Sequence, residues 1–202
     1  MPNLISYVFK GLNRRINSNY LTLPSKPQCI IISPGGTGTV SIIKYLNNYI
    51  TTNLHLERKY KLIGLAHLFK PPKYFSKKNV KVILIKRDVN SIYKSLKKRN
   101  FLRNSLSFYG DLFPFIYINI FKNENKLKKK FINYLKNFYK NWIGYNNLLI
   151  IDYEKIFGSF NEKKKIKDYL NIKDKNFIKN FPNKKRYKYN KDFIDPSQKT
   201  WD

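Results

Sequence analysis

The sequence is poor in the side chains that form disulfide frameworks and zinc sites. It contains one cysteine, Cys29, and two histidines, His55 and His67, among 202 residues. A single cysteine excludes an intramolecular disulfide, and so few ligands argue against a Cys- or His-based zinc centre. Cys29 adjoins an apolar run, which predicts a small core residue. We therefore expect no metal cofactor.

Long hydrophobic runs are also missing. No segment approaches the roughly 18–20 consecutive apolar residues that a membrane-spanning helix needs. Residues 1–20 lack the continuous apolar core and the cleavage site of a signal peptide. The sequence therefore predicts a soluble, cytoplasmic protein without a transmembrane segment.

Acidic residues are scarce. The 12 Asp and Glu residues stand against 41 Lys and Arg residues, a formal net charge of +29, which attracts partners that carry phosphate or sulfate. Most of the basic residues are lysines, whereas readers of nucleic-acid bases favour the bidentate contacts of arginine. AT-rich codons would also supply lysine, together with the abundant Asn, Ile, Tyr and Phe. A nucleic-acid partner is therefore an open alternative, and it is not the favoured one.

The pattern of apolar residues predicts an α/β fold. The length suits one domain over residues 1–202, and 42% of the residues are hydrophobic, enough for a sizeable core. Strands alternating with helices argue for three layers, with a mostly parallel sheet and helices on both faces. Apolar runs predict strands at 28–32, 80–85 and 148–151, with a weaker candidate at 61–65; helical spacing predicts helices at 40–49, 90–98, 125–142 and 161–170. Residues 1–26 are expected to be an N-terminal extension and 181–202 a basic C-terminal tail.

A loop of small residues follows the first predicted strand. Its glycines allow a sharp turn with consecutive backbone N–H groups, and the next helix directs its partly positive N-terminus to the same point. Together these features predict an anion-binding loop, although glycines can also serve only tight packing. A Walker A motif needs Lys and then Ser or Thr after its last glycine, whereas Thr39 and Val40 follow Gly38. The predicted binding residues are Gly35, Gly36, Thr37, Gly38, Thr39, Val40 and Ser41.

This loop resembles the phosphosulfate loop of sulfotransferases that use 3′-phosphoadenylyl sulfate (PAPS). Thr37, Gly38, Thr39 and Ser41 match the family pattern, and Gly36 stands where the family has Lys or Arg. In the family that basic residue helps to stabilise the leaving phosphate. The resemblance implies a P-loop NTPase-like fold of the sulfotransferase type, with PAPS as the cofactor and no metal. Lys44 and Lys86 are candidates to supply the missing cation.

The segment after the second strong strand carries a second match. Arg87-Asp88 follows residues 81–86, and Ser95 comes eight residues after Arg87, as in the family's motif for the 3′-phosphate. An arginine at a strand end offers a planar fork of donors to a phosphate, and a serine in the next helix can donate its hydroxyl. Taken singly, Arg87 could instead form a surface ion pair, for example with Asp88, and Ser95 could be an ordinary helix-surface residue.

A histidine is the candidate general base. His67 precedes Arg87 by twenty residues, and a catalytic histidine lies at a similar distance in the cytosolic members of the family. Histidine can take a proton from an acceptor hydroxyl near neutral pH. A packed loop histidine is the alternative interpretation. Glu57 is the second candidate, because other branches of the family use a glutamate, and His55 is the third.

The third strand ends in a further match of lower information. Tyr153-Glu154 fits the family's Tyr-Glu after a strand, while Asp152 replaces an Arg, and we interpret this dipeptide as a fold marker. The family's C-terminal Arg-Lys-Gly motif is not found. The resemblance implies transfer of a sulfuryl group from PAPS to a hydroxyl or amine of an acceptor, with a carbohydrate as one candidate. A non-catalytic, basic nucleotide- or nucleic-acid-binding protein is the alternative.

Overall fold

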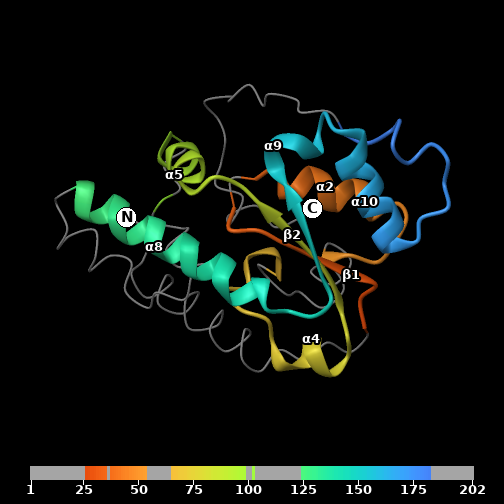
Figure 1. The fold of residues 1–202 in the computed structure, drawn as a ribbon, viewed down its shortest axis with the longest axis horizontal. Coiled ribbons are helices and arrows are strands. Elements are labelled where there is room, and N and C mark those ends of the chain that lie inside the picture. Colours follow the sequence, from red (N-terminus) through yellow and green to blue (C-terminus); the bar gives the residue numbers. More distant parts are fainter. Residues whose placement is uncertain (1–25, 36, 54–64, 99–101, 103–123, 183–202) are drawn as a thin grey trace, which may run out of the picture.

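A three-stranded parallel sheet forms the centre of the molecule (Figure 1). The computed structural model describes residues 26–35, 37–53, 65–98, 102 and 124–182. The strands are β1 (Cys29–Ile32), β2 (Lys81–Lys86) and β3 (Leu148–Asp152), in the order β1-β2-β3. The predicted α/β class and the three strands predicted at 28–32, 80–85 and 148–151 are confirmed.

Helices cover both faces of the sheet. Successive side chains of a strand point to opposite faces, so each strand contributes apolar residues to two cores. Ile30, Ile32, Val82 and Leu84 pack in a core with residues of α5 (Val89–Lys98) and α8 (Glu124–Ile143). Cys29, Ile31, Ile83 and Ile85 pack in a second core with residues of α2 (Thr39–Leu46) and α10 (Phe160–Leu170). A strand buried on both faces needs apolar residues at every position, which explains the unbroken run of β1.

The register of the strands brings their carboxyl ends to one edge of the sheet. Ile32 at the end of β1 pairs with Leu84, and Lys86 at the end of β2 pairs with Asp152 at the end of β3. The three segments that follow these strands therefore start close together. This edge is the place where ligands of open α/β sheets bind.

The structure differs from the predicted helices and strands at four short segments. Helix α2 ends at Leu46, before the predicted end at residue 49, and Leu65 begins a 3-10 turn, η1 (Leu65–His67), where a strand was the weaker candidate. The helices α4 (Lys73–Lys77) and α9 (Tyr153–Ile156) were not predicted, because helices of five and four residues are too short to show a period. The rest of the 61–65 candidate, residues 1–25 of the N-terminal extension and residues 183–202 of the tail lie outside the described part.

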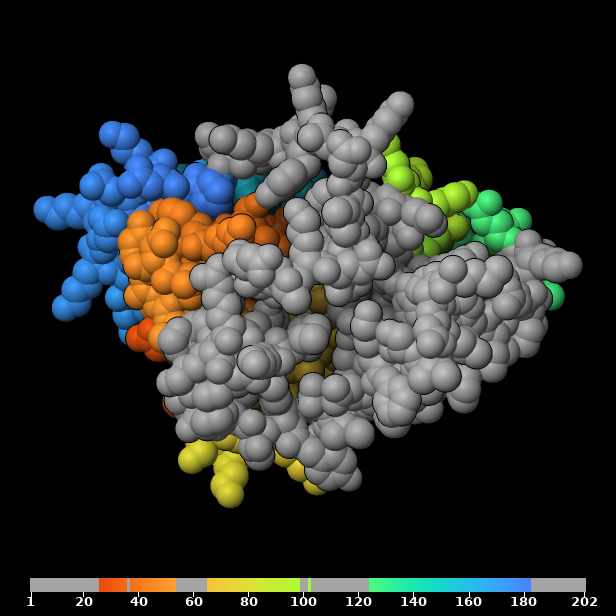
Figure 2. All heavy atoms as spheres, turned by 180° about the vertical axis from the view of Figure 1, so that it is seen from behind, coloured from red at the N-terminus to blue at the C-terminus, as the bar shows by residue number. Residues whose placement is uncertain are grey.

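The last residues that the structure describes pack against α2. Tyr45 of α2 lies with its ring centroid 5.3 Å from that of Phe177 and 5.1 Å from that of Phe181. Figure 2 shows α2, in orange, side by side with this C-terminal segment, in blue. The ordered core therefore extends to Phe181, where the basic tail was expected to begin.

Cys29 is the core residue that was predicted. It is fully buried in the second core, and burial raises the pKa of its thiol. Among the helices described between residues 26 and 182, none combines the length and the apolar character needed to cross a membrane.

Candidate functional site

The glycine loop connects β1 to α2 at the carboxyl edge of the sheet. Gly35 and Gly38 have positive φ angles of 82° and 61°, a left-handed conformation that glycine adopts without strain. Helix α2 begins at Thr39, directly after Gly38, so its first N–H groups lie in the loop. Gly36 lies outside the described residues. The loop has the turn and the helix N-terminus that an anion-binding site of this kind requires.

Two of the predicted hydroxyl donors point into the protein. Thr37 is fully buried and Thr39 is 6% exposed, and their hydroxyl oxygens lie 2.7 Å apart. Thr39 also shares a hydrogen bond with the buried hydroxyl of Ser33. These bonds fix the inner side of the loop. An anion at this loop would therefore meet backbone N–H groups rather than these two hydroxyls, while Ser41 is partly exposed and Val40 is 45% exposed.

His67 lies against the glycine loop. Its Nδ1 is 2.7 Å from the carbonyl oxygen of Ser33, and the Ser33 N–H donates to the carbonyl of Ala66 at 2.8 Å. A Cβ atom at Gly35 would lie 3.8 Å from Cε1 of His67. Because a carbonyl can only accept, Nδ1 carries the hydrogen, and in the neutral ring Nε2 has the basic lone pair. The structure thus brings the predicted base beside the predicted loop.

Helix α8 anchors the segment that contains His67. The Trp142 side chain is fully buried, and its Nε1–H donates to the carbonyl of Leu68 at 2.9 Å. Asn141 donates to the carbonyl of Phe69 at 3.2 Å. Two adjacent residues of one rigid helix therefore hold the backbone that follows His67. The other two candidate bases, His55 and Glu57, lie outside the described residues.

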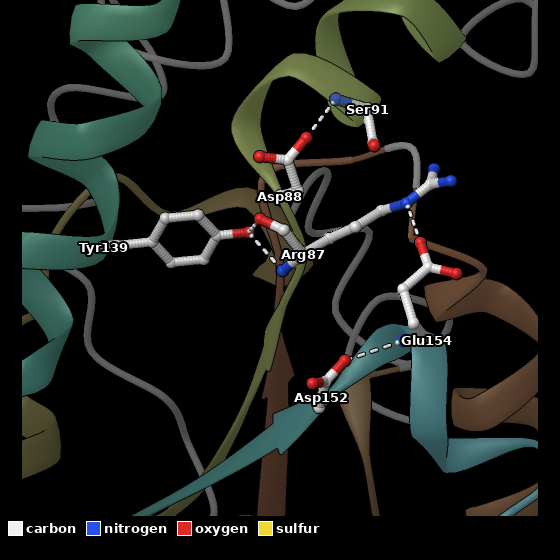
Figure 3. Close-up of polar contacts among 6 residues, drawn as sticks. All are labelled: Arg87, Asp88, Ser91, Tyr139, Asp152 and Glu154. Carbon is white, nitrogen blue, oxygen red and sulfur yellow. Dashed lines mark hydrogen bonds and ion pairs between the residues drawn. The ribbon is translucent and has the colours of Figure 1, made fainter.

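Arg87 projects from the end of β2 toward the residues that follow β3. Its Nε–H donates to Oε1 of Glu154 at 2.8 Å (Figure 3). Its guanidinium carbon lies 4.4 Å from the centre of the Tyr153 ring. The Arg87 side chain is 17% exposed and that of Glu154 is 47% exposed. The backbone of Arg87 is also fixed, because its N–H donates to Oη of Tyr139 at 3.0 Å. The arginine is therefore held by contacts from two other elements.

Asp88, considered above as an ion partner of Arg87, has a different part in the structure. Its Oδ1 accepts the N–H of Ser91 at 2.8 Å and so caps the N-terminus of α5. Hydrogen bonds from Ser91 lower the pKa of the Asp88 carboxyl, with the charge of Arg87 as a minor contribution. The carboxylate bonded to the Arg87 side chain is Glu154, 67 residues further along the chain.

The remaining predicted residues lie on β2 and on the helices α2 and α5. Ser95 is partly buried in α5, about 9 Å along the helix axis from Val89. Its contact with a phosphate stays a prediction. Lys86 is exposed at the end of β2, and Lys44 is exposed on α2. Their role as the missing cation stays a prediction.

Tyr153 and Glu154 are the site residues that sequence reasoning missed. They were interpreted as a fold marker, yet they provide the aromatic face and the carboxylate that contact Arg87. The available signal was their position directly after β3, at the same edge as Arg87. A charged residue and an aromatic residue at the end of a neighbouring parallel strand are candidates for contact with any arginine there.

Of the two loop glycines that the structure describes, Gly38 has less room for a side chain than Gly35. A Cβ atom there would lie 3.3 Å from Cε2 of Tyr153 and 3.4 Å from Cζ of Phe157, and its φ is +61°. We expect Gly38→Ala to lower the free energy of unfolding by about 1–3 kcal/mol, because it adds strain and crowding together. Urea unfolding measures this change. Gly158→Ala is the control, since a Cβ there meets nothing within 4 Å, and equal losses in the two variants would contradict the expectation.

Comparison of the chain with protein-family models, with curated proteins and with solved structures found no match. The function is therefore argued from the site. Within the described ranges, no group of three or more His, Cys, Asp or Glu side chains is arranged to hold a metal ion.

Proposed function

We propose that this protein is a sulfotransferase that binds PAPS and transfers its sulfuryl group to a hydroxyl or amine. The observation that carries this proposal is the meeting of three segments far apart in the sequence. The glycine loop, His67 and Arg87 lie at the carboxyl edge of one parallel sheet. The Ser33–His67 bond links the first two, and the Tyr153 ring lies against the Arg87 guanidinium and 3.3 Å from the point where a Cβ atom at Gly38 would lie. The sequence resemblance assigned these same segments to one site.

The local chemistry fits the cofactor. Glycine at positions 35 and 38 lets the loop take its left-handed turns without strain, and a Cβ atom at position 38 would press against Tyr153 and Phe157. The N-terminus of α2 and the charge of Arg87 both favour anions. When bound, PAPS supplies the activated sulfuryl group. The proposal also implies that this α/β fold is a P-loop NTPase-like domain of the sulfotransferase type.

Each predicted site residue has one role, in binding PAPS or in proton transfer. Backbone N–H groups of the loop at 35–41 bind the 5′-phosphosulfate, for which those of Gly35 and Ser41 would exchange their bonds to Ser33 Oγ and to the Gly38 carbonyl. Arg87 and Ser95 bind the 3′-phosphate. Nε2 of His67 accepts the proton of the acceptor hydroxyl, since the Nδ1 side of the ring is bonded to Ser33. Because Gly36 replaces the usual basic residue, Lys44 or Lys86 would have to supply a cation, and both are exposed.

Arg87→Ala is expected to weaken binding of adenosine 3′,5′-bisphosphate by about tenfold or more. A charge-assisted hydrogen bond contributes about 1.5–3 kcal/mol, and a factor of ten corresponds to about 1.4 kcal/mol. Isothermal titration calorimetry measures the affinity. Arg87→Lys keeps the charge without the planar fork, and its affinity for the bisphosphate should lie between those of the wild type and Arg87→Ala. An unchanged affinity in Arg87→Ala would reject the assignment of Arg87.

The nucleotide specificity can be tested with the unmodified protein. Thermal shifts with adenosine 3′,5′-bisphosphate, ATP and AMP at equal concentration should show the largest stabilisation for the bisphosphate, because the ligand that binds the folded protein most tightly raises its unfolding temperature most. Equal shifts for the three nucleotides would favour a general phosphate site.

A second function is favoured by a basic groove along α8. Its lining includes Lys126, Lys128, Lys129, Lys130 and Lys136, and no carboxylate is among the described residues that line it. Such a surface suits a phosphate backbone. A salt-sensitive gel shift with DNA or RNA, in a protein that does not bind the bisphosphate, would favour a nucleic-acid-binding protein instead.

A further inference from the structure

Tyr153 lies between the glycine loop and Arg87. A Cβ atom at Gly38 would lie 3.3 Å from Cε2 of Tyr153, so the loop approaches the edge of this ring as closely as glycine permits. The guanidinium carbon of Arg87 lies 4.4 Å from the centre of the same ring. One aromatic side chain therefore separates the two segments to which the proposed function assigns phosphate groups.

Glu154 fixes the direction of the same guanidinium. Its Oε1 accepts from Nε of Arg87 at 2.8 Å, and Figure 3 shows the two terminal nitrogens of Arg87 pointing away from this carboxylate. The backbone of Glu154 is held in turn, because its N–H donates to Oδ1 of Asp152 at 2.9 Å. The guanidinium is thus restrained by a ring beneath it and by a carboxylate at its Nε edge.

We infer that Tyr153 and Glu154 are positioning residues that hold the Arg87 guanidinium beside the glycine loop for anion binding. This inference rests on the proposed function. A side chain already held in place needs less ordering when a ligand binds, and this raises the affinity. The negative charge of Glu154 acts in the opposite direction, since it repels an anion. Its two contributions, an acceptor oxygen and a charge, can be separated by substitution.

Two pairs of variants separate these contributions. Glu154→Gln keeps an acceptor oxygen and removes the charge, whereas Glu154→Ala removes both, so the alanine variant should bind adenosine 3′,5′-bisphosphate about three- to tenfold more weakly than the glutamine variant. Tyr153→Phe keeps the ring and should bind as the wild type does. Tyr153→Leu loses the cation–π contact and should bind the bisphosphate about three- to tenfold more weakly than Tyr153→Phe does.

The matched control uses Glu124, an exposed carboxylate at the start of α8 that is paired with Lys97. Glu124→Gln and Glu124→Ala change the net charge as the Glu154 variants do, away from Arg87. They should bind the bisphosphate with equal affinity. A gap between them as large as that between the Glu154 variants would overturn the inference, because the effect would then not depend on Arg87.

A nuclear magnetic resonance measurement tests the positioning without any ligand. The Nε–Hε resonance of Arg87, assigned by its loss in Arg87→Lys, should exchange slowly with water in the wild type and in Glu154→Gln. It should exchange fast in Glu154→Ala. Slow exchange in Glu154→Ala, or fast exchange combined with an unchanged affinity, would overturn the inference.

Failure of the proposed function has a different outcome. A wild type that does not bind the bisphosphate would reject PAPS as the cofactor while leaving the exchange result intact. Inorganic pyrophosphate is then the probe. Movement of the Arg87 resonance on adding pyrophosphate, in the wild type and less in Glu154→Ala, would support anion binding at the positioned guanidinium. A resonance that does not move would overturn the inference.

Discussion

Replacing Trp142 with alanine is expected to lower the free energy of unfolding by about 3–5 kcal/mol. Trp142 is fully buried, and its ring packs beside those of Phe75 and Tyr145, with centroids 6.3 Å and 6.2 Å away. The substitution removes this apolar contact and leaves a cavity. It also leaves the carbonyl of Leu68 without the indole donor. The total is a large part of the 5–15 kcal/mol that is typical of a folded domain.

Urea unfolding followed by circular dichroism measures this loss. Ile143→Ala is the control, because Ile143 adjoins Trp142 on the same helix and is 55% exposed, so its truncation should cost well under 1 kcal/mol beyond helix propensity. Trp142→Phe keeps part of the ring volume and loses the hydrogen bond, so its loss of stability should lie between those of Trp142→Ala and Ile143→Ala. A loss below about 1 kcal/mol for Trp142→Ala would mean that α8 does not anchor the first core.

The central sheet could be predicted because its strands are local apolar runs. Ile30, Ile31 and Ile32 stand together before a glycine loop, and residues 82–85 repeat that pattern before Arg87. A strand buried on both faces has no polar alternation, so its signal lies in composition and length. The long helix α8 could be predicted because Phe131, Leu135, Phe138 and Trp142 recur at helical spacing and face one core.

The contacts of the site could not be predicted in the same way. The bond from Arg87 to Glu154 joins residues 67 positions apart, and nothing near either residue specifies the other. The hydroxyls of Thr37 and Thr39 could face a ligand or the core, and only the packing against Ser33 decides that they face inward. Sequence spacing placed the segments at one edge of a sheet. The direction of each side chain depends on tertiary contacts that spacing does not contain.

The second large effect is expected at His67, where catalysis and binding should separate. His67→Asn can keep the hydrogen bond to Ser33, because the amide nitrogen of Asn takes the place of Nδ1, while no basic nitrogen replaces Nε2. Loss of a general base slows proton transfer by about 10²–10⁴-fold. We therefore expect transfer from PAPS to fall by that factor, with affinity for adenosine 3′,5′-bisphosphate unchanged.

Transfer of labelled sulfate from PAPS to a panel of hydroxyl and amine acceptors measures the rate, and calorimetry measures the affinity. His67→Ala is the comparison, because it removes both the base and the bond that holds the loop at Ser33. It should lose rate and also bind the bisphosphate more weakly. Full activity in His67→Asn would show that His67 serves only to pack against the loop, and the base would then have to be sought elsewhere in the chain.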